Sequence, residues 1–427
     1  MKVLIVGGGG REHAIALKIK ENPEVTALYA APGNGGIAQI ATCLPFKATD
    51  VDGIVRWEAE NKVDFVIVAP DDPLCLGMVD ALAEQGIPAF GPRKNAAIIE
   101  GSKVFSKNLM KKYGIPTAAY ETFDDYDAAV KYLQTADMPI VVKADGLALG
   151  KGVLICPDRD SAVEAVASMM KEAKFGASGA RVVIEEFLTG PEVSVLAFTD
   201  GKTVKPMVSS MDHKRALDHD EGLNTGGMGT IAPNPCYTPE LAQRCMDEIF
   251  LPTIAAMNAE GRTFTGCLYF GLMMTPKGPK VIEYNCRFGD PETQVVLPLL
   301  KSDLLTIMRA TVDGTLADTP VEFASGAACC VVLASGGYPV SYKSGYPISG
   351  LDEAGKTATV FHAGTKLIDG QIVTAGGRVL GVTATADTLE AAIDKAYQAA
   401  DKITFTDMHM RRDIGQRALA SRKESHS

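Results

Sequence analysis

Four consecutive glycines, Gly7 to Gly10, follow a short apolar strand at the start of the chain, with Arg11 and Glu12 directly after them. A strand that runs into glycines and then a helix can hold a phosphate group, because backbone N–H groups face the anion. A dinucleotide site does not fit. Glu12 stands where the third glycine would be, and the next apolar run, ALYAAPGN, lacks a ribose-binding acid. We predict a sugar-phosphate or mononucleotide site with Arg11 as its cation; a tight turn without a ligand is the alternative.

A second glycine-rich segment, KADGLALGKG, runs from Lys143 to Gly152. It differs from a P-loop, because only three residues separate Gly146 from Gly150, and Gly152 follows Lys151 where a serine or threonine would bind magnesium. Strand-like runs flank it on both sides. We predict a hairpin whose glycine tip folds over phosphates, with Lys143 and Lys151 as charges. An ordinary surface hairpin is the alternative.

Acidic residues interrupt the apolar run VVIEEFLTGPE at Glu185 and Glu186, after which Phe187 and Leu188 follow. This pattern suits a slot for adenine, where backbone groups contact the edge of the base, with Glu192 beyond it to hold ribose hydroxyls. The alternative is the solvated end of a strand.

The segment VIEYNCRFGDPETQ places Glu283, Asn285 and Arg287 on one side of a strand, because side chains alternate between faces. Val281 is expected on that face too. A carboxylate and an amide oxygen about 7 Å apart could share a hard cation, and the arginine would face the anion that the cation also holds. Asp290 and Glu292 follow at the start of a helix. A surface ladder of salt bridges is the alternative.

The elements that position these residues change in character along the chain. The first hundred residues alternate apolar runs such as KVLIVG and DFVIVAP with helix-like stretches, which predicts βαβ units and a parallel, doubly wound sheet. From Gly101 onward, helices and β-rich runs follow in a different order. After Gly326 the pattern becomes short alternating strands and a helix at 389–400.

Composition limits the function further. The chain of 427 residues has a net charge of −10 and a pI of about 5.2, so no basic surface for nucleic acid or an anionic membrane is expected. Its nine cysteines form no CxxC pair and are expected to be reduced and mostly buried. No signal peptide or membrane span is recognisable. We expect a soluble, cytoplasmic protein of several domains.

Taken in order, these segments resemble the ATP-grasp superfamily, and within it the glycinamide ribonucleotide synthetase family. The matching segments are GGGGREHA, EGSKVFSK, VVKADGLALGKGV, IEEFLTGPEVS, DHKR, NTGGMG, VIEYNCRFGDPETQ, FHAGTK, GGRVL and RRDIG. The resemblance covers nearly the whole chain and implies an enzyme that ligates glycine to 5-phosphoribosylamine in purine synthesis. ATP would first convert glycine into glycyl phosphate, with Mg²⁺ or Mn²⁺ as the metal. A monomer or weak dimer is expected.

The resemblance also assigns roles to residues. The metal would bind Glu283 and Asn285, and the catalytic cations would be Arg287, Lys143 and Lys151. Contacts with ATP are expected from Lys103, Lys143, Gly146, Gly150, Lys151, Gly152, Glu185, Glu186, Leu188 and Glu192. Contacts with the two substrates are expected from Gly8, Gly9, Gly10, Arg11, Glu12, Asp71, Asp212, Lys214, Asn224, Thr225, Gly226, Arg287 and Asp290.

The chain departs from the family pattern at two places. The family usually has Gly-Pro-Glu where this chain has Ala69-Pro70-Asp71, which shortens a carboxylate expected near the substrate ribose, and it has Pro where Leu223 stands. Related ligases often carry a further acid on the strand before Glu283; Gly271 is expected at that place, which would leave fewer protein ligands for the metal.

The resemblance implies an α/β, multi-domain ATP-grasp architecture. A Rossmann-like domain (1–100) would precede the ATP-grasp core (101–118 and 192–325), with a lid subdomain (119–191) inserted, and a small mixed β domain of the single-hybrid kind (326–427) would close the chain. Another ATP-grasp carboxylate–amine ligase, or a bicarbonate-dependent carboxylase, is the nearest alternative. A regulatory module that binds ATP without turnover and a dehydrogenase are others.

Overall fold

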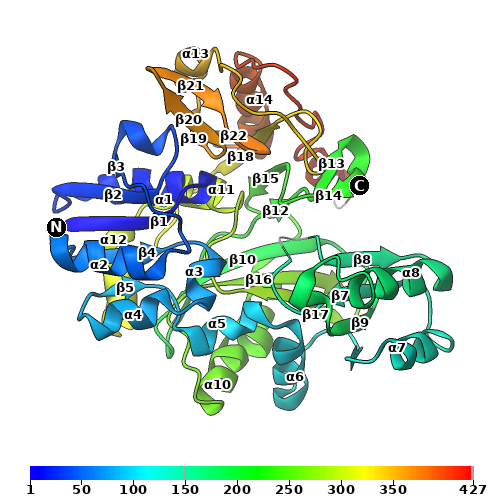
Figure 1. Ribbon diagram of the computed structural model, residues 1–427. Helices are drawn as coiled ribbons and strands as arrows, with labels where there is room; N and C mark the ends of the chain where they lie inside the picture. Colours follow the sequence, from blue (N-terminus) through cyan, green and yellow to red (C-terminus); the bar gives the residue numbers. More distant parts are fainter. Residues whose placement is uncertain (149–150, 425–427) are drawn as a thin grey trace.

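The computed structural model describes residues 1–148 and 151–424. The described residues form six sheets, two of which are two-stranded hairpins. The β-rich part that ends the chain lies at the top of Figure 1. The expected α/β, multi-domain architecture is confirmed.

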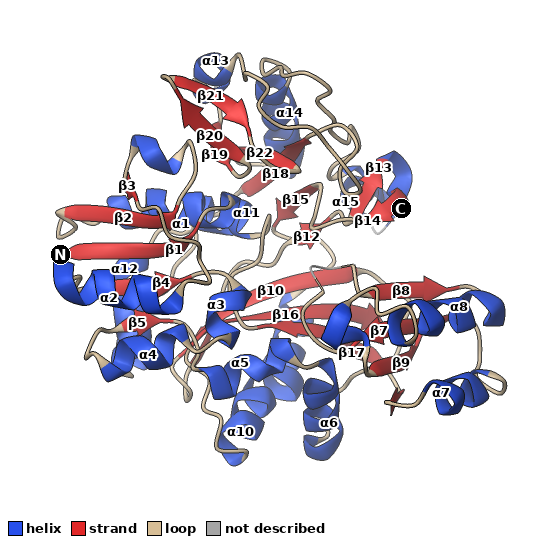
Figure 2. Cartoon of the chain, viewed as in Figure 1, coloured by secondary structure: helices blue, strands red, loops and turns tan. Residues whose placement is uncertain are grey.

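The amino-terminal part is a five-stranded parallel sheet in the order β3-β2-β1-β4-β5, as the alternating pattern predicts. Its strands are β1 (Lys2–Gly7), β2 (Ala27–Pro32), β3 (Thr42–Cys43), β4 (Phe65–Val68) and β5 (Ala89–Phe90). Its helices are α1 (Gly10–Lys20), α2 (Val51–Asn61), α3 (Asp71–Cys75), α4 (Met78–Glu84) and α5 (Lys94–Gly101). Alternate residues of β1 and β4 enter two different core clusters, so both faces of the sheet are covered, as Figure 2 shows.

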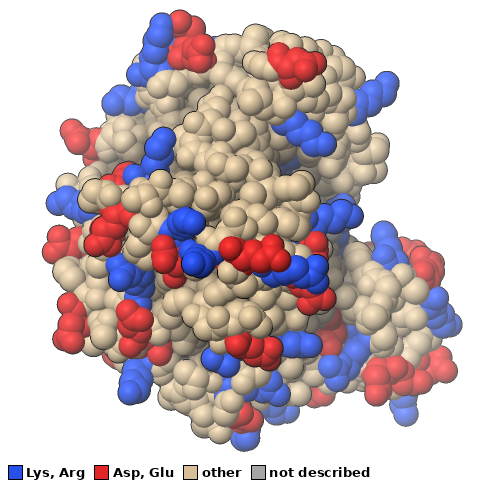
Figure 3. Space-filling view, turned by 60° about the vertical axis from the view of Figure 1, so that its left-hand side comes forward, with Lys and Arg blue, Asp and Glu red and all other residues tan. Residues whose placement is uncertain are grey.

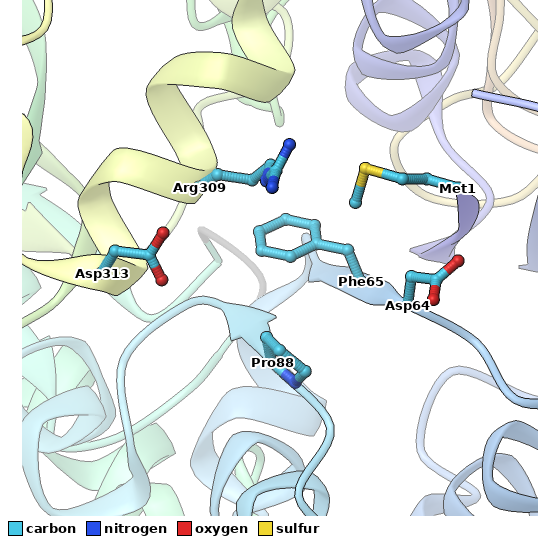
Figure 4. A pocket seen from close by; sticks show the side chains of 6 residues that line it. All are labelled: Met1, Asp64, Phe65, Pro88, Arg309 and Asp313. Carbon is cyan, nitrogen blue, oxygen red and sulfur yellow. The ribbon is translucent and has the colours of Figure 1, made fainter. Parts of the chain in front are cut away.

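A cavity of about 410 Å³ lies at the amino ends of these strands. It is lined by Met1, Asp64, Phe65, Pro88, Arg309 and Asp313 (Figure 4). In open α/β sheets, ligands bind at the carboxyl ends of the strands, where the glycine loop follows β1. The cavity is therefore on the wrong edge of the sheet to belong to that site.

Residues 120–186 form an antiparallel sheet in the order β6-β9-β7-β8 with two helices on one face. The elements are β6 (Tyr120–Phe123), α7 (Tyr126–Leu133), β7 (Ile140–Ala144), β8 (Val153–Cys156), α8 (Arg159–Met170) and β9 (Val182–Glu186). The predicted hairpin is confirmed, because β7 and β8 pair antiparallel on either side of the glycine-rich segment. This sheet has a core cluster of its own.

A second antiparallel sheet, β11-β10-β16-β17, forms the centre of the molecule. It consists of β10 (Glu192–Thr199), β11 (Val204–Pro206), β16 (Gly266–Thr275) and β17 (Gly278–Asn285), with α6 (Lys103–Tyr113), α9 (Pro239–Cys245) and α10 (Leu251–Ala259) nearby. After β17 the chain forms α11 (Thr293–Val296) and α12 (Leu304–Asp313).

The last sheet, β12-β15-β18-β22-β19, is antiparallel and joins strands from two distant parts of the chain. Its strands are β12 (Met211–Asp212), β15 (Gly229–Ala232), β18 (Ala327–Ala334), β19 (Thr359–His362) and β22 (Arg378–Ala386). The remaining elements are the hairpins β13 (Arg215–Leu217) with β14 (Glu221–Asn224) and β20 (Thr365–Ile368) with β21 (Gln371–Thr374), and the helices α13 (Leu351–Gly355), α14 (Leu389–Ala400) and α15 (Gln416–Glu424).

All nine cysteines are free thiols, and six of them are buried, as expected. Among residues 1–148 and 151–424, no helix is long and apolar enough to cross a membrane.

One buried carboxylate in α2 has no evident partner. Glu58 is 0% exposed, one turn after the buried Ile54, and neither carboxylate oxygen accepts a hydrogen bond from the described residues. Burial raises the pKa of Glu58 to about 8, because a charge without a partner is costly in an apolar surrounding.

We expect Glu58→Leu to stabilise the protein more at pH 8.5 than at pH 5.5. The folded state holds the Glu58 proton more tightly than the unfolded chain, so the free energy of unfolding falls as the pH rises from 4.5 to about 8. Removing the carboxyl should therefore add on the order of 3 kcal/mol more at the higher pH. Urea unfolding followed by the fluorescence of Trp57, the single tryptophan, measures this. Glu60→Leu, at an exposed position of the same helix, is the control, and an equal effect of Glu58→Leu at both pH values would contradict the expectation.

Candidate active site

The glycine loop between β1 and α1 is tightly packed against two other segments. A Cβ atom on Gly8 would lie 2.4 Å from the carbonyl oxygen of Gly33, and one on Gly10 would lie 2.4 Å from the Gln294 side chain. Gly7 has φ +123°, which side chains rarely allow. These contacts leave no room for side chains, which explains why the loop consists of glycines. The loop follows β1, so its backbone lies at the carboxyl end of the parallel sheet.

Glu12 and Asp290 accept N–H groups of this loop. Glu12 is 1% exposed and accepts the Gly9 N–H at 2.8 Å and Arg11 Nε at 2.9 Å. The Arg11 N–H donates to Asp290 Oδ2 at 3.2 Å, and Arg11 Nη1 donates to the carbonyl oxygen of Phe288 at 3.1 Å. The carboxylate of Glu12 thus fixes the loop and its arginine from inside the protein.

Asp290 joins three parts of the chain. Its Oδ1 accepts Gln294 Nε2 at 2.8 Å and lies 3.7 Å from Arg378 Nη2. Arg378 also donates to the carbonyl oxygen of Asp290 at 2.9 Å. Burial alone would raise the pKa of Asp290, but Arg378 and Arg11 outweigh it and the pKa is lowered.

Glu185 is held between two lysines. In the β7–β9 ladder Val141 pairs with Glu185, so Lys143 is a diagonal neighbour of Glu185 on the face away from the sheet's own core. Glu185 Oε1 lies 3.1 Å from Lys143 Nζ and 3.3 Å from Lys107 Nζ, and all three side chains are at most 5% exposed. Lys143 Nζ also donates to the carbonyl oxygen of Ile282 at 3.2 Å. Burial lowers the pKa of Lys107 to about 8, although Glu185 opposes the shift.

Lys103 contacts the start of the glycine tip. Its Nζ donates to the carbonyl oxygen of Gly146 at 2.8 Å. The neighbouring Asp145 accepts the N–H of Val104 at 3.1 Å and Arg181 Nη2 at 2.7 Å, so it links α6 to the hairpin. Burial lowers the pKa of Lys103, with Glu283 opposing the shift.

At the other end of the glycine-rich segment, Lys151 contacts the carboxyl-terminal part of the chain. Lys151 is exposed, and its Nζ donates to the carbonyl oxygen of Pro339 at 3.4 Å. Gly152 is buried, and a Cβ atom there would lie 2.7 Å from Ala148. Gly150 lies outside the described residues.

Of the residues expected around adenine, Glu185 is buried between its two lysines, whereas Glu186 and Leu188 lie at or just beyond the exposed end of β9. Glu186 is exposed and its side chain pairs with Lys280 at 3.1 Å, while Leu188 is half-buried. Glu192, at the start of β10, is exposed as well. These side chains surround a strand end that water or a ligand can reach.

Strand β17 presents polar side chains as expected, with one exception. Arg287 Nη2 donates to Asn285 Oδ1 at 3.2 Å, so the two side chains lie on one side. The expectation that Val281 shares this face is wrong, because Val281 is 0% exposed and packs in the same core cluster as Tyr284. Alternation fails at a β-bulge in which Ile282 is the extra residue.

Glu283 is surrounded by cations. Its Oε1 lies 3.7 Å from Lys214 Nζ, and both side chains are about a third exposed, at 33% and 38%. Burial alone would raise the pKa of Glu283, but Lys214, Lys143 and Lys103 outweigh it and the pKa is lowered. Gly271, on the preceding strand, pairs directly with Glu283, as expected.

The donor set on β17 fits a hard cation that is held only in part by protein. Glu283 and Asn285 supply two oxygens, and the described residues contain no group of three or more His, Cys, Asp or Glu side chains that could hold a metal. Mg²⁺ usually keeps several waters and binds one or two carboxylates together with substrate phosphates. Two protein oxygens, from Glu283 and Asn285, match this way of binding Mg²⁺, and the nearby lysines are placed to contact the substrate phosphates.

Arg287 is fixed by a residue of the amino-terminal part. Its Nη2 lies 3.0 Å from Glu100 Oε1, and the Cys286 N–H donates to Glu100 Oε2 at 2.7 Å. Arg287 therefore pairs with neither Asp290 nor Glu292. Burial raises the pKa of Glu100 to about 7, although Arg287 opposes the shift.

Asp71 begins α3 and faces the same arginine. Burial alone would raise the pKa of Asp71, but Arg287 and Arg11 outweigh it and the pKa is lowered. Asp71 is thus brought close to two cations of the site despite its shorter side chain.

The segment from Asp212 to Gly229 borders the site with both backbone atoms and side chains. Thr225 Oγ1 donates to the carbonyl oxygen of Lys214 at 2.9 Å, and a Cβ atom on Gly226 would lie 2.8 Å from the Arg378 guanidinium carbon. Asn224 pairs with Arg215 across the β13–β14 hairpin. Burial and the charge of Glu292 raise the pKa of Asp212 well above its usual value.

The same hairpin is anchored by the RRDIG segment. Arg411 is 1% exposed, pairs with Asp413 at 2.9 Å and Asp220 at 3.1 Å, and donates to the carbonyl oxygen of Arg215 at 3.1 Å. The hairpin therefore cannot move without breaking these contacts, and Arg411 has a structural role.

Four residues of this region are absent from the expected set: Glu100, Lys107, Asp145 and Arg378. Each lies in or beside a segment that carries the family resemblance. The burial of Lys107, which only the structure shows, marks it as a candidate site residue, because lysine is rarely buried without a charged partner. Figure 3 shows lysines and arginines interspersed with acidic residues over one face of the molecule.

Comparisons with known proteins match the whole length of the chain. The family models for phosphoribosylglycinamide synthetase match as its N domain over residues 1–100, its ATP-grasp (A) domain over 101–293 and its C domain over 328–417. A phosphoribosylamine–glycine ligase of Halalkalibacterium halodurans is 48% identical over 425 residues, which is 100% of this chain and 99% of that protein. The crystal structure of a Thermotoga maritima phosphoribosylamine–glycine ligase has a TM-score of 0.86 at 35% identity, covering 97% of this chain and 100% of that one. The biotin carboxylase domain of a Hydrogenobacter thermophilus 2-oxoglutarate carboxylase shares the fold, with a TM-score of 0.72 at 18% identity over 96% of this chain and 91% of that one.

Proposed function

Because the chain belongs to the phosphoribosylglycinamide synthetase family, we propose that the site around β17 ligates glycine to 5-phosphoribosylamine through a glycyl phosphate. The activity is that of a phosphoribosylamine–glycine ligase of purine synthesis, in the ATP-grasp superfamily. The observation that supports the assignment of the site is the convergence on β17: Glu283 faces lysines from α6, β7 and the segment after β12, and Arg287 contacts Asn285 on the same strand side. We also propose the domain division 1–100, 101–118 with 192–325, 119–191 and 326–427, action in the cytoplasm, and a monomer or weak dimer.

The chemistry explains why such a site needs cations rather than a nucleophile. A carboxylate is a poor electrophile, and phosphoryl transfer from ATP turns one of its oxygens into part of a leaving phosphate. The amine of phosphoribosylamine then attacks the acyl carbon, phosphate leaves, and the nitrogen loses a proton. The protein's task is to position the reactants and to stabilise negative charge as it moves.

The residues divide this task. Lys103 and Lys143, near Glu283, bind the ATP phosphates, and the 146–152 tip covers them to exclude water from the acyl phosphate. The end of β9, with Glu186 and Leu188, contacts adenine, and Glu192 binds ribose. Glu283 and Asn285 would hold Mg²⁺ or Mn²⁺, which would neutralise charge on the transferred phosphoryl group.

The second substrate lies toward the parallel sheet. The Gly8–Arg11 loop binds the phosphate of phosphoribosylamine, and Asp71 lies toward its ribose. Arg378 extends this subsite from β22, since its guanidinium reaches Asp290 beside the loop. Asp212, Lys214 and the 224–226 turn border the glycine end. Glu12 acts by shaping the loop.

We expect ADP and phosphate to form only when ATP, Mg²⁺, glycine and phosphoribosylamine are all present, with one ATP consumed per amide. A coupled ADP-release assay with freshly generated phosphoribosylamine, with product quantified by mass spectrometry, measures this. Omission of each component in turn is the control. Turnover with bicarbonate in place of glycine would instead indicate a carboxylase.

A further inference from the structure

Two buried glutamates in the site make the same pair of contacts. Glu12 accepts the backbone N–H of Gly9 at 2.8 Å and the Arg11 guanidinium at 2.9 Å. Glu100 accepts the backbone N–H of Cys286 at 2.7 Å and lies 3.0 Å from the Arg287 guanidinium. The two carboxylates are only 1% and 8% exposed. Each therefore ties one arginine to the backbone of the loop or strand beside it.

The two arginines meet at one carbonyl group. Arg11 Nη1 donates to the carbonyl oxygen of Phe288 at 3.1 Å, and Arg287 Nη1 donates to the same oxygen at 3.3 Å. The Phe288 ring is 2% exposed and packs against Phe90 and Phe198, so this carbonyl is fixed by the core. Like charges this close repel each other, and the two glutamates offset that repulsion.

One N–H donor of the Arg287 guanidinium has no acceptor among the described residues. Its Nη groups contact Glu100, Asn285 and Phe288, while Nε is buried and makes no hydrogen bond with the described residues. A buried donor without a partner is uncommon in proteins and points to a missing acceptor. Glu100 Oε1 lies within ion-pair distance of the Arg287 guanidinium, and Asp71 faces the same group from α3. The closer carboxylate, Glu100, therefore helps to set where that donor points.

We propose that Glu100 is a positioning residue for the ligation: it aligns Arg287 so that its guanidinium holds the anionic end of the acyl phosphate until the amine attacks, while the Gly8–Arg11 loop holds the phosphate of phosphoribosylamine. The inference rests on the proposed function and concerns a residue of α5, outside the strand that carries Glu283 and Asn285. If Arg287 is misaligned, the acyl phosphate has time to react with water, and ATP is consumed without amide formation.

Glu100→Gln tests the proposal, because glutamine keeps the size and an acceptor for the Cys286 N–H but loses the charge that holds Arg287. We expect the KM for ATP to stay within twofold of wild type, kcat/KM for glycine to fall at least tenfold, and the ratio of ADP to amide to rise from one to two or more. Glu24→Gln, which removes an exposed pair with Arg309, should behave like wild type. The wild-type assay comes first, so loss of the proposed function is distinguished from loss of this inference.

Two further variants separate positioning from a merely structural contact between α5 and β17. Glu100→Asp keeps the charge on a side chain that is one methylene shorter. We expect its ratio of ADP to amide to rise above one, but less than in Glu100→Gln, with an unchanged melting temperature. Combining Glu100→Gln with Arg287→Lys should cost little more than Arg287→Lys alone, since both act on one guanidinium. A ratio of one in Glu100→Asp would overturn the proposal even if Glu100→Gln does not fold. Where Glu100→Gln folds, losses that multiply in the double variant would overturn it as well.

Discussion

Glu283→Gln is expected to lower kcat by on the order of a hundredfold or more, because phosphoryl transfer depends on bound metal and cations for charge stabilisation. Glutamine keeps the shape of the side chain but removes the negative charge that a hard cation requires. Lys214, Lys143 and Lys103 face this carboxylate, and with it gone they would repel one another with less compensation. Steady-state kinetics as a function of Mg²⁺ concentration measures the effect, which should include a weaker dependence on the metal.

The melting temperature of Glu283→Gln should fall only slightly, because its carboxylate and Lys214 are partly exposed and exposed pairs contribute little. Glu248→Gln, which removes an exposed helical pair with Arg244, is a matched control and should keep full activity. Wild-type kcat and an unchanged magnesium dependence in Glu283→Gln would remove this residue from the site.

Arg287→Lys is expected to lower kcat/KM for glycine about thirtyfold, which corresponds to a loss of roughly 2 kcal/mol of transition-state stabilisation. Arginine contacts Glu100, Asn285 and Phe288 together, whereas lysine has one nitrogen and no fork to place on an anion. A lysine could still pair with Glu100, so folding and the KM for ATP should be close to normal.

The comparison that decides this prediction is Arg309→Lys, a substitution in the exposed pair with Glu24. Both variants change an arginine in an ion pair, but only Arg287 lies in the proposed site. If Arg287→Lys keeps kcat/KM within threefold of wild type, as Arg309→Lys should, then Arg287 has a structural role only.

Local pattern determined which elements exist and which residues lie on their polar faces. The alternation in the first hundred residues predicts the parallel sheet that β1 to β5 form, because strand and helix periodicities are properties of neighbouring residues. The same holds for the β7–β8 hairpin and for Asn285 and Arg287 on one side of β17. Where an extra residue enters the ladder, as at Ile282, alternation fails and Val281 turns into the core. A β-bulge depends on how two strands pair, so it cannot be predicted from the residue pattern of one strand alone.

Which charges pair with one another depends on long-range packing. Arg287 could have paired with Asp290 or Glu292 nearby in sequence, yet its partner is Glu100, which lies 187 positions earlier and reaches β17 because α5 packs there. Likewise, Lys107 and Lys143 share Glu185, and Arg378 reaches Asp290 from the last sheet. An ion pair forms where packing places two side chains within a few ångströms, and burial then makes that partner obligatory. The strand and helix patterns of the chain predict the fold class, because those patterns are local, whereas packing between distant segments determines how each side chain of the proposed site is held.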